Sequence, residues 1–222
     1  MKTNLVNPIK IAAKIIDIIY PQDCPVCKRK PKVTSLCENC AKMYISGQKA
    51  MISSEIISEN LTTIFAIDDF NPQIRNVIHN LKYNGIEKYA QDILRLGITP
   101  FYDELKNADI ITSVPLHFFR LIRRGYNQAA ILAKVAANEL QIPYERLLFR
   151  TRYNFTQTKK NSEKRRKAVI GLFAMRKKKR ISGKTIVIVD DVCTTSATIS
   201  ECVKRLYENG AKKVIILCLA KT

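Results

Sequence analysis

The chain has 222 residues, which is long enough for one domain with a hydrophobic core and a small additional module. Hydrophobic residues make up 46% of the sequence, a value typical of globular proteins that excludes wholesale disorder. No stretch reaches the roughly 18 uninterrupted apolar residues of a membrane-spanning helix, so the sequence predicts no transmembrane segment. The formal net charge of +19 favours partners that carry phosphate.

Residues 1–20 are predicted to form an amphipathic helix that packs on the body of the protein. The segment is apolar but contains Lys10, Lys14 and Asp17, whose spacing places them on one face of a helix. These charges disfavour a secretory signal peptide, which keeps its apolar region uncharged. Docking of the helix on a membrane surface is a second interpretation.

Two Cys-x2-Cys pairs follow, Cys24 with Cys27 and Cys37 with Cys40, and nine residues separate them. This is the ligand spacing of a tetrahedral structural Zn2+ site without an open coordination position. An iron–sulfur cluster and a disulfide pair are the alternatives. Basic residues between the two pairs leave open whether the module binds phosphate backbones or only caps its neighbour. The remaining three cysteines lie in α/β segments, and free core cysteines favour a reducing, cytoplasmic location.

The rest of the chain is predicted to be an α/β domain over residues 46–222, preceded by an N-terminal module over residues 1–45. Residues 45–60 are polar and indicate a linker or the remnant of a hairpin. Strands are expected at 63–70, 108–114, 146–152, 183–190 and 212–220, and helices at 72–84, 86–97, 127–140 and 196–210. Continuous Val and Ile runs are typical of a mostly parallel sheet with helices on both faces.

Residues 150–184 hold 14 Lys and Arg against one acid, so +13 of the net charge lies in this segment. Such an excess indicates a phosphorylated small ligand, a nucleic acid or both, while a solvated loop without a partner is the alternative. Within the segment, residues 153–168 are expected to be a long loop. The run RKKKR at 176–180 indicates either a solvated hairpin tip or a contact to a nucleic-acid backbone.

The stretch VIVDDVCTTSATI places Asp190 and Asp191 at the carboxyl end of a buried strand, where parallel α/β sheets bind ligands. A run of hydroxyl residues follows and leads into a helix N-terminus, where free N–H groups and the helix dipole favour an anion. Acceptors for sugar hydroxyls or Mg2+ next to a phosphate cradle together describe a ribose 5-phosphate. An acidic strand end that merely caps a helix is the alternative.

This motif resembles the 5-phosphoribosyl-1-pyrophosphate (PRPP) motif of the type I phosphoribosyltransferases. The resemblance implies that the two acids hold the ribose hydroxyls of Mg-PRPP and are the catalytic candidates. It also implies a phosphate loop made by Thr194, Thr195, Ser196, Ala197 and Thr198. Ser196 stands where the family usually has Gly, and a Ser at φ > 0 costs about 1 kcal/mol.

The resemblance extends to the ComF family, phosphoribosyltransferase-like proteins linked to DNA uptake in competent bacteria. It is carried by the VP dipeptide with R-x-x-R-R-G-Y-N-Q, by IRNVIHNLKYNG with Lys82, by R-x-R-x-x-x-T-Q and by the four cysteines. It implies a type I phosphoribosyltransferase fold with a hood at about 61–100, a core at about 108–222 and a zinc-ribbon-like module. The implied pyrophosphate contacts come from the SVPL turn (113–116), from the loop expected after Pro115 and from a closing loop at 153–168: Val114, Pro115, Arg120, Arg123, Arg124, Lys159, Lys160, Arg165 and Arg166.

Two functions remain open at this stage. The first is a phosphoribosyltransferase whose acceptor the sequence does not name. The second is a PRPP sensor or scaffold that binds single-stranded DNA, because aromatic residues such as Tyr83 and Tyr126 lie among the basic residues and could stack on bases. In both cases other DNA-uptake proteins are candidate partners.

Overall fold

The computed structural model describes residues 23–31, 35–57, 59–84, 86–116, 118–151, 171–176, 180–193 and 197–222. The predicted helix at 1–20 and the predicted loop at 153–168 lie outside the described residues. Among the helices that the structure describes, none is long and apolar enough to cross a bilayer.

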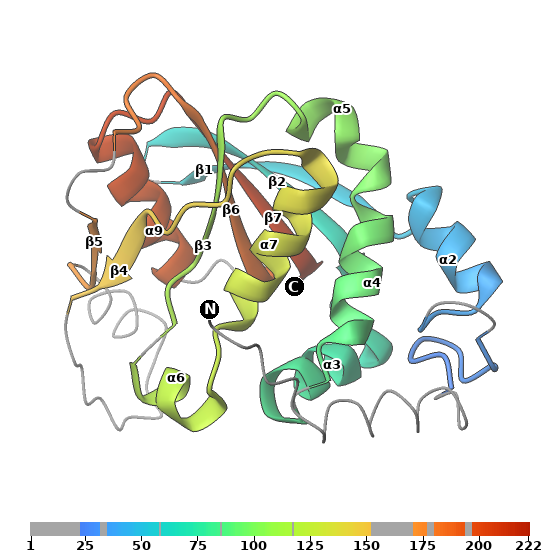
Figure 1. Ribbon diagram of the computed structural model, residues 1–222. Coiled ribbons are helices and arrows are strands. Elements are labelled where there is room, and N and C mark those ends of the chain that lie inside the picture. Colours follow the sequence, from blue (N-terminus) through green and yellow to red (C-terminus); the bar gives the residue numbers. More distant parts are fainter. Residues whose placement is uncertain are drawn as a thin grey trace, which may run out of the picture.

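A five-stranded sheet forms the centre of the protein, in the order β1-β2-β7-β6-β3 (Figure 1). Its strands are β1 (Met51–Ile57), β2 (Asn60–Asp69), β3 (Ile110–Ser113), β6 (Thr185–Cys193) and β7 (Lys213–Lys221). Only the edge strand β1 is antiparallel to its neighbour, whereas the β2–β7, β7–β6 and β6–β3 pairs are parallel. The predicted mostly parallel sheet is therefore confirmed.

Helices cover both faces of this sheet because the central strands are apolar on both sides. Val187 and Val189 of β6 belong to the core under α4 (Lys88–Gly97) and α7 (Gln128–Leu140). Ile186 and Ile188 point the other way, into the core under α9 (Ala197–Glu208). Full burial of one such side chain contributes about 1.5–3 kcal/mol relative to exposure. Because its side chains alternate between the two cores, β6 stabilises the packing of helices on both faces of the sheet.

The hood consists of α3 (Pro72–His79), a π-helical turn η1 (Asn80–Asn84) and α4. Asn71 starts α3 because its side chain accepts a hydrogen bond from the Ile74 amide, and Pro72 occupies the first turn, where its missing N–H costs nothing. The sequence predicts one continuous helix over 72–84, but its last five residues form the π turn instead.

The cysteine segment packs on the hood rather than standing apart. Helix α2 (Glu38–Ile45) contacts α4, and Ser35 binds the buried Asp92 carboxylate of α4 through both its hydroxyl (2.6 Å) and its amide (3.2 Å). The short elements η2 (Thr99–Phe101) and α5 (Tyr102–Leu105) then lead from α4 to β3. The cysteines thus share a core with α3, α4 and α7.

Residues 45–60 include the edge strand β1, which forms a hairpin with β2, so the structure favours the hairpin interpretation over the linker. Two other segments differ from the sequence-based expectation. The segment expected to be a loop after Pro115 contains a short helix, α6 (Phe118–Arg124). The strand predicted at 146–152 is β4 (Leu148–Arg150), which pairs with β5 (Phe173–Met175) in a separate antiparallel ribbon outside the central sheet.

Candidate functional site

The acidic pair lies where strand β6 extends beyond the end of its neighbour β3. The β3–β6 pairing ends at Ser113 and Val189, whereas β6 continues beside β7 to Cys193. Asp190 and Asp191 are therefore inside β6 rather than at its tip, where the sequence predicted the strand to end. Because β3 no longer covers this side, the carboxylates border an open crevice at the carboxyl edge of the sheet.

A lysine of the hood neutralises this pair. The Lys82 ammonium lies 2.9 Å from Oδ2 of Asp191, which is buried. Burial and the adjacent Asp191 charge raise the pKa of Asp190 well above its usual range, while the Lys82 charge and the Asp191 amide, which donates to Asp190 Oδ1 at 2.8 Å, act in the opposite direction. The site thus holds two close carboxylates with a single ammonium as their compensation.

The π turn presents Lys82 to the acids and is fixed by residues at the end of α6 and just after it. The Tyr126 hydroxyl donates to the Leu81 carbonyl. Arg124 donates to the Tyr83 hydroxyl at 3.3 Å, and its guanidinium lies 4.9 Å from the centre of the Tyr83 ring. π turns occur frequently at functional sites, and this one connects the hood to the arginine-rich helix.

A cavity of about 420 Å³ joins these groups. Eight of the residues predicted from the sequence line it together: Val114, Pro115, Arg120, Arg123, Arg124, Asp190, Asp191 and Thr198. Ala197 is the first residue of α9, next to Thr198, but is not part of the lining. The other predicted residues lie outside the described part of the chain: Lys159, Lys160, Arg165, Arg166, Thr194, Thr195 and Ser196.

The cavity also gathers buried polar atoms that lack a hydrogen bond to the protein. Four buried side-chain atoms of the described residues lack a hydrogen bond, and all four belong to residues that line this cavity: Arg124 Nη1, Gln128 Oε1, Arg150 Nε and Asp191 Oδ2. The Lys82 contact is an ion pair without hydrogen-bond alignment, so Asp191 Oδ2 is still able to accept. Buried polar groups are almost always hydrogen-bonded, and such a concentration of exceptions indicates a polar ligand.

Sequence reasoning did not place Lys82, Gln128 or Arg150 among the binding residues. Lys82 was recognisable only through the IRNVIHNLKYNG resemblance, and Arg150 through the R-x-R segment. Asn127, which also lines the cavity, fixes the loop after β3 to α7: its Nδ2 donates to the Val114 carbonyl at 3.0 Å and its Oδ1 accepts from the Ala129 amide. The GYNQ run was the available signal for this cap.

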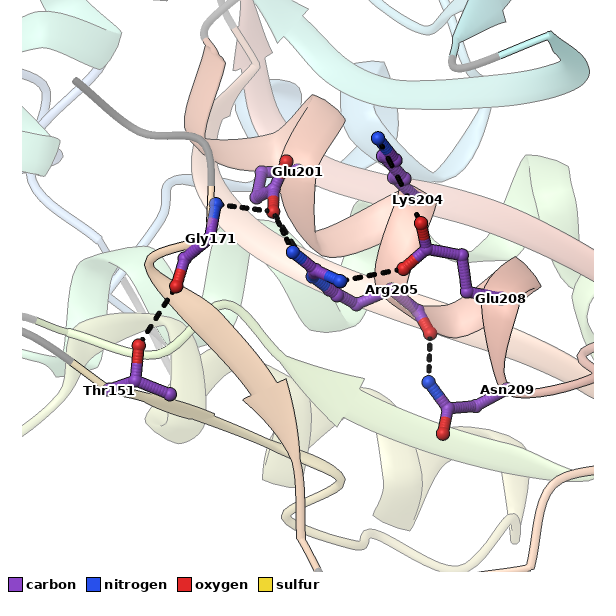
Figure 2. Close-up of polar contacts among 7 residues, drawn as sticks. All are labelled: Thr151, Gly171, Glu201, Lys204, Arg205, Glu208 and Asn209. Carbon is purple, nitrogen blue, oxygen red and sulfur yellow. Dashed lines mark hydrogen bonds and ion pairs between the residues drawn. The ribbon is translucent and has the colours of Figure 1, made fainter. Parts of the chain in front are cut away.

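Helix α9 also holds the base of the segment that lies outside the described residues (Figure 2). Glu201 is buried and accepts hydrogen bonds from the Gly171 amide (2.9 Å) and from Arg205 (3.1 Å). The Gly171 carbonyl in turn accepts from the Thr151 hydroxyl at 2.9 Å. Residues 151 and 171 are thus joined to each other and to the helix whose first turn borders the cavity.

The four cysteines form a separate, compact cluster. Their Sγ atoms all lie within 4.8 Å of one another, and three of the four residues are buried. With metal–sulfur bonds of about 2.3 Å, a tetrahedral ion separates its ligands by roughly 3.8 Å, so the cluster fits a structural metal. Burial acts to raise the pKa of the Cys27 thiol, but hydrogen bonds from Arg29 outweigh it and bring the value to about 6, whereas burial raises the pKa of the Cys40 thiol.

The parallel sheet with its hood, and the site at its carboxyl edge, define the phosphoribosyltransferase fold. Residues 122–222 match the family model described as phosphoribosyl transferase domain. The DNA utilization protein YhgH of Escherichia coli O157:H7 is 32% identical over 165 residues, which cover 72% of each chain. Competence protein F of Haemophilus influenzae is 30% identical over 83% of this chain and 78% of that protein. The ComFC protein of Bacillus subtilis is 23% identical over 84% of this chain and 72% of its own length. The chain belongs to the ComF family of phosphoribosyltransferase-like proteins.

Proposed function

We propose that the cavity beside β6 binds Mg-PRPP and that the protein acts in DNA uptake. The observation that carries the binding proposal is the set of four unpartnered buried atoms around the acidic pair, since donors and acceptors occur together there. PRPP offers both counterparts, because its ribose hydroxyls donate and its phosphates accept. The role in DNA uptake is supported by the names of the relatives, which are a DNA utilization protein and competence proteins.

Each group has a proposed task. Asp190 and Asp191 accept the ribose hydroxyls, and the residues from Thr194 to Thr198 surround the 5-phosphate. The guanidinium groups of α6 bind the pyrophosphate, because an arginine fork matches two phosphate oxygens at once. Mg2+ neutralises part of the pyrophosphate charge when it is bound. Further cations would come from the residues between Thr151 and Gly171 in the sequence, namely Lys159, Lys160, Arg165 and Arg166.

Transfer, where it occurs, begins with loss of pyrophosphate from C1 of the ribose. The C1–O bond breaks, its electron pair leaves with pyrophosphate and positive charge develops at C1. Carboxylates fixed beside the ribose stabilise this charge in a partly dry site. An acceptor nucleophile then forms the new bond to C1 and loses its proton to solvent or to a base.

Contact with single-stranded nucleic acid is a second function in this proposal. It is supported by the Arg123 and Arg124 guanidinium groups, which lie 5.8 and 4.9 Å from the centre of the exposed Tyr83 ring. Such pairs of aromatic and basic groups suit a strand with stacked bases. A structural Zn2+ on the four cysteines, a cytoplasmic location and contacts to other DNA-uptake proteins complete the proposal.

Calorimetric titration of PRPP and Mg2+ into the zinc-loaded protein tests the first function. We expect saturable, Mg2+-dependent binding that disappears in the Asp190→Asn/Asp191→Asn variant. The control is Asp103→Asn, which removes an acid that is 83% exposed and pairs with Lys106 on the surface. Wild-type protein that does not bind, or a double variant that binds equally well, would contradict the proposal. Release of pyrophosphate with candidate acceptors then tests turnover separately.

A further inference from the structure

A second cavity of about 470 Å³ adjoins the first, and the proposed PRPP site does not account for it. The loop after β3 separates the two, because Pro115 and Leu116 line both of them. Arg150 of β4 and Asn127 are also shared. The rest of the second lining comes from the end of β3, the end of α6 and the residues just after it, the first turns of α7, the segment between α7 and β4, and the β4–β5 ribbon.

The charge of this lining has one sign. Lys134, Arg146, Arg150 and Arg176 line the cavity, and no Asp or Glu does. Within the described part of the chain, none of these four cations forms an ion pair. Buried Arg150 Nε has no acceptor there, and burial followed by the nearby Arg120 charge lowers the pKa of Arg150. A guanidinium that is partly desolvated and near a second cation is stabilised by an anion.

The other half of the lining is apolar and aromatic. The Phe149 side chain is 38% exposed although it lies on a strand, and Tyr126, Tyr144 and Leu121 complete this wall. The hydroxyls of Tyr144 and Ser113 lie 3.1 Å apart and offer a polar edge. An inorganic anion would not contact this apolar wall. A nucleotide could stack its base on the wall and place its phosphate beside the cations.

We propose that the second cavity binds a nucleotide, with the base against Phe149 and the phosphate on Arg146, Arg150 and Arg176. The ligand is either a free nucleoside monophosphate or one unit of a single strand, since both present the same chemistry. Its phosphate would share Arg150 with the ligand of the first cavity, so the two ligands would be neighbours. The inference goes beyond the proposed PRPP site and does not depend on it.

The test uses the full, zinc-loaded chain and two probes, AMP and a fluorescein-labelled oligothymidylate. The Arg146→Gln/Arg176→Gln variant removes two cations of the second cavity only. The control, Lys212→Gln/Lys213→Gln, removes the same charge from the opposite end of the sheet, where β7 begins. We expect the arginine variant to weaken oligonucleotide binding about tenfold or more and to reduce the salt slope by about 1.4, and the control to change affinity less than about twofold. Phe149→Ala should weaken binding about tenfold through lost stacking.

The outcomes separate the alternatives. AMP that binds and displaces the oligonucleotide supports a free nucleotide as ligand, and binding of the strand alone supports a unit within a strand. Equal losses in the arginine and lysine variants would overturn the inference, because they would indicate attraction by general surface charge. Failure of both probes to bind would overturn it as well. The Asp190→Asn/Asp191→Asn variant should keep wild-type affinity for the oligothymidylate, so that result does not depend on PRPP binding. Thermal melts verify that each variant is folded.

Discussion

Replacement of Lys82 by Met tests whether the hood stabilises the acidic pair. The ammonium lies 2.9 Å from Asp191 Oδ2, a separation at which unit charges attract by about 6 kcal/mol in an effective dielectric of about 20, before desolvation is subtracted. Removal of one member of a fully buried pair costs about 3–5 kcal/mol. Because 24% of the Lys82 side chain is exposed, we expect the variant to lose about 2–3 kcal/mol of unfolding free energy at neutral pH.

The pH dependence of this loss identifies its cause. Lys82 is one of the groups that lower the pKa of Asp190, so its removal raises that pKa further. Between the ordinary Asp pKa of 3.8 and the raised pKa of Asp190, this carboxylate is protonated in the folded state but not in the unfolded state. The folded state therefore binds more protons than the unfolded state in this pH window. Stability therefore falls as pH rises through this window, and the deficit of the variant should shrink on acidification.

Urea denaturation at pH 5 and pH 7.5 measures both effects. Lys82→Arg keeps the charge and should retain most of the stability. Lys106→Met is the matched control: it removes a lysine from the exposed pair with Asp103 and should cost less than about 1 kcal/mol. A Lys82→Met protein as stable as wild type at pH 7.5, or with a deficit that does not change with pH, would refute the electrostatic explanation.

The supports of the site give three further predictions. Glu201→Gln weakens the bonds to Arg205 and the Gly171 amide and should cost about 1–2 kcal/mol in urea denaturation. Glu208→Gln, at the exposed end of the same network (Figure 2), should cost less than half as much. Removal of metal by a chelator should lower the Tm by destabilising the core that the cysteines share with α4, and added Zn2+ should restore it; an unchanged Tm would contradict a structural metal. Gly97→Ala places a Cβ 2.2 Å from Ile67 Cγ2 and should cost about 1–3 kcal/mol, with partial rescue by Ile67→Ala.

The sequence was sufficient to predict the layered fold because its periodicities are strong. The Val and Ile runs of β6 and β7 are buried on both faces, and the sheet that they imply is present. It was insufficient for β1 and α6, where the elements are stabilised by neighbours distant in the chain. Three of the four apolar residues of β1 are exposed, and Lys221 of β7 binds both Ser53 and Glu55 of that strand. No local pattern encodes such a contact.

A second acidic pair shows why the site itself needed the structure. Asp68 and Asp69 also end a buried strand at the carboxyl edge of the sheet, as Asp190 and Asp191 nearly do. The buried Asp68 carboxylate accepts from the Tyr44 hydroxyl at 2.8 Å and from Asn71 at 3.0 Å. Burial raises its pKa to about 6, but its oxygens have partners within the protein. Asp191 Oδ2 instead pairs with Lys82 of the hood and lines the cavity, a difference that the residue types alone do not reveal and on which the binding role proposed for Asp191 rests.

The unpartnered atoms also explain why the site draws on so many elements. A buried polar group without a hydrogen bond costs about 1–3 kcal/mol, and the first cavity holds four of them in a protein of marginal stability. Lys82 from the hood, Asn127 at the start of α7 and Glu201 in α9 each fix an element that borders the cavity. Under the proposed function, a ligand with both donors and acceptors would remove this cost. Ligand binding would in this way restore stability and would couple occupancy of the cavity to the hood and to α9.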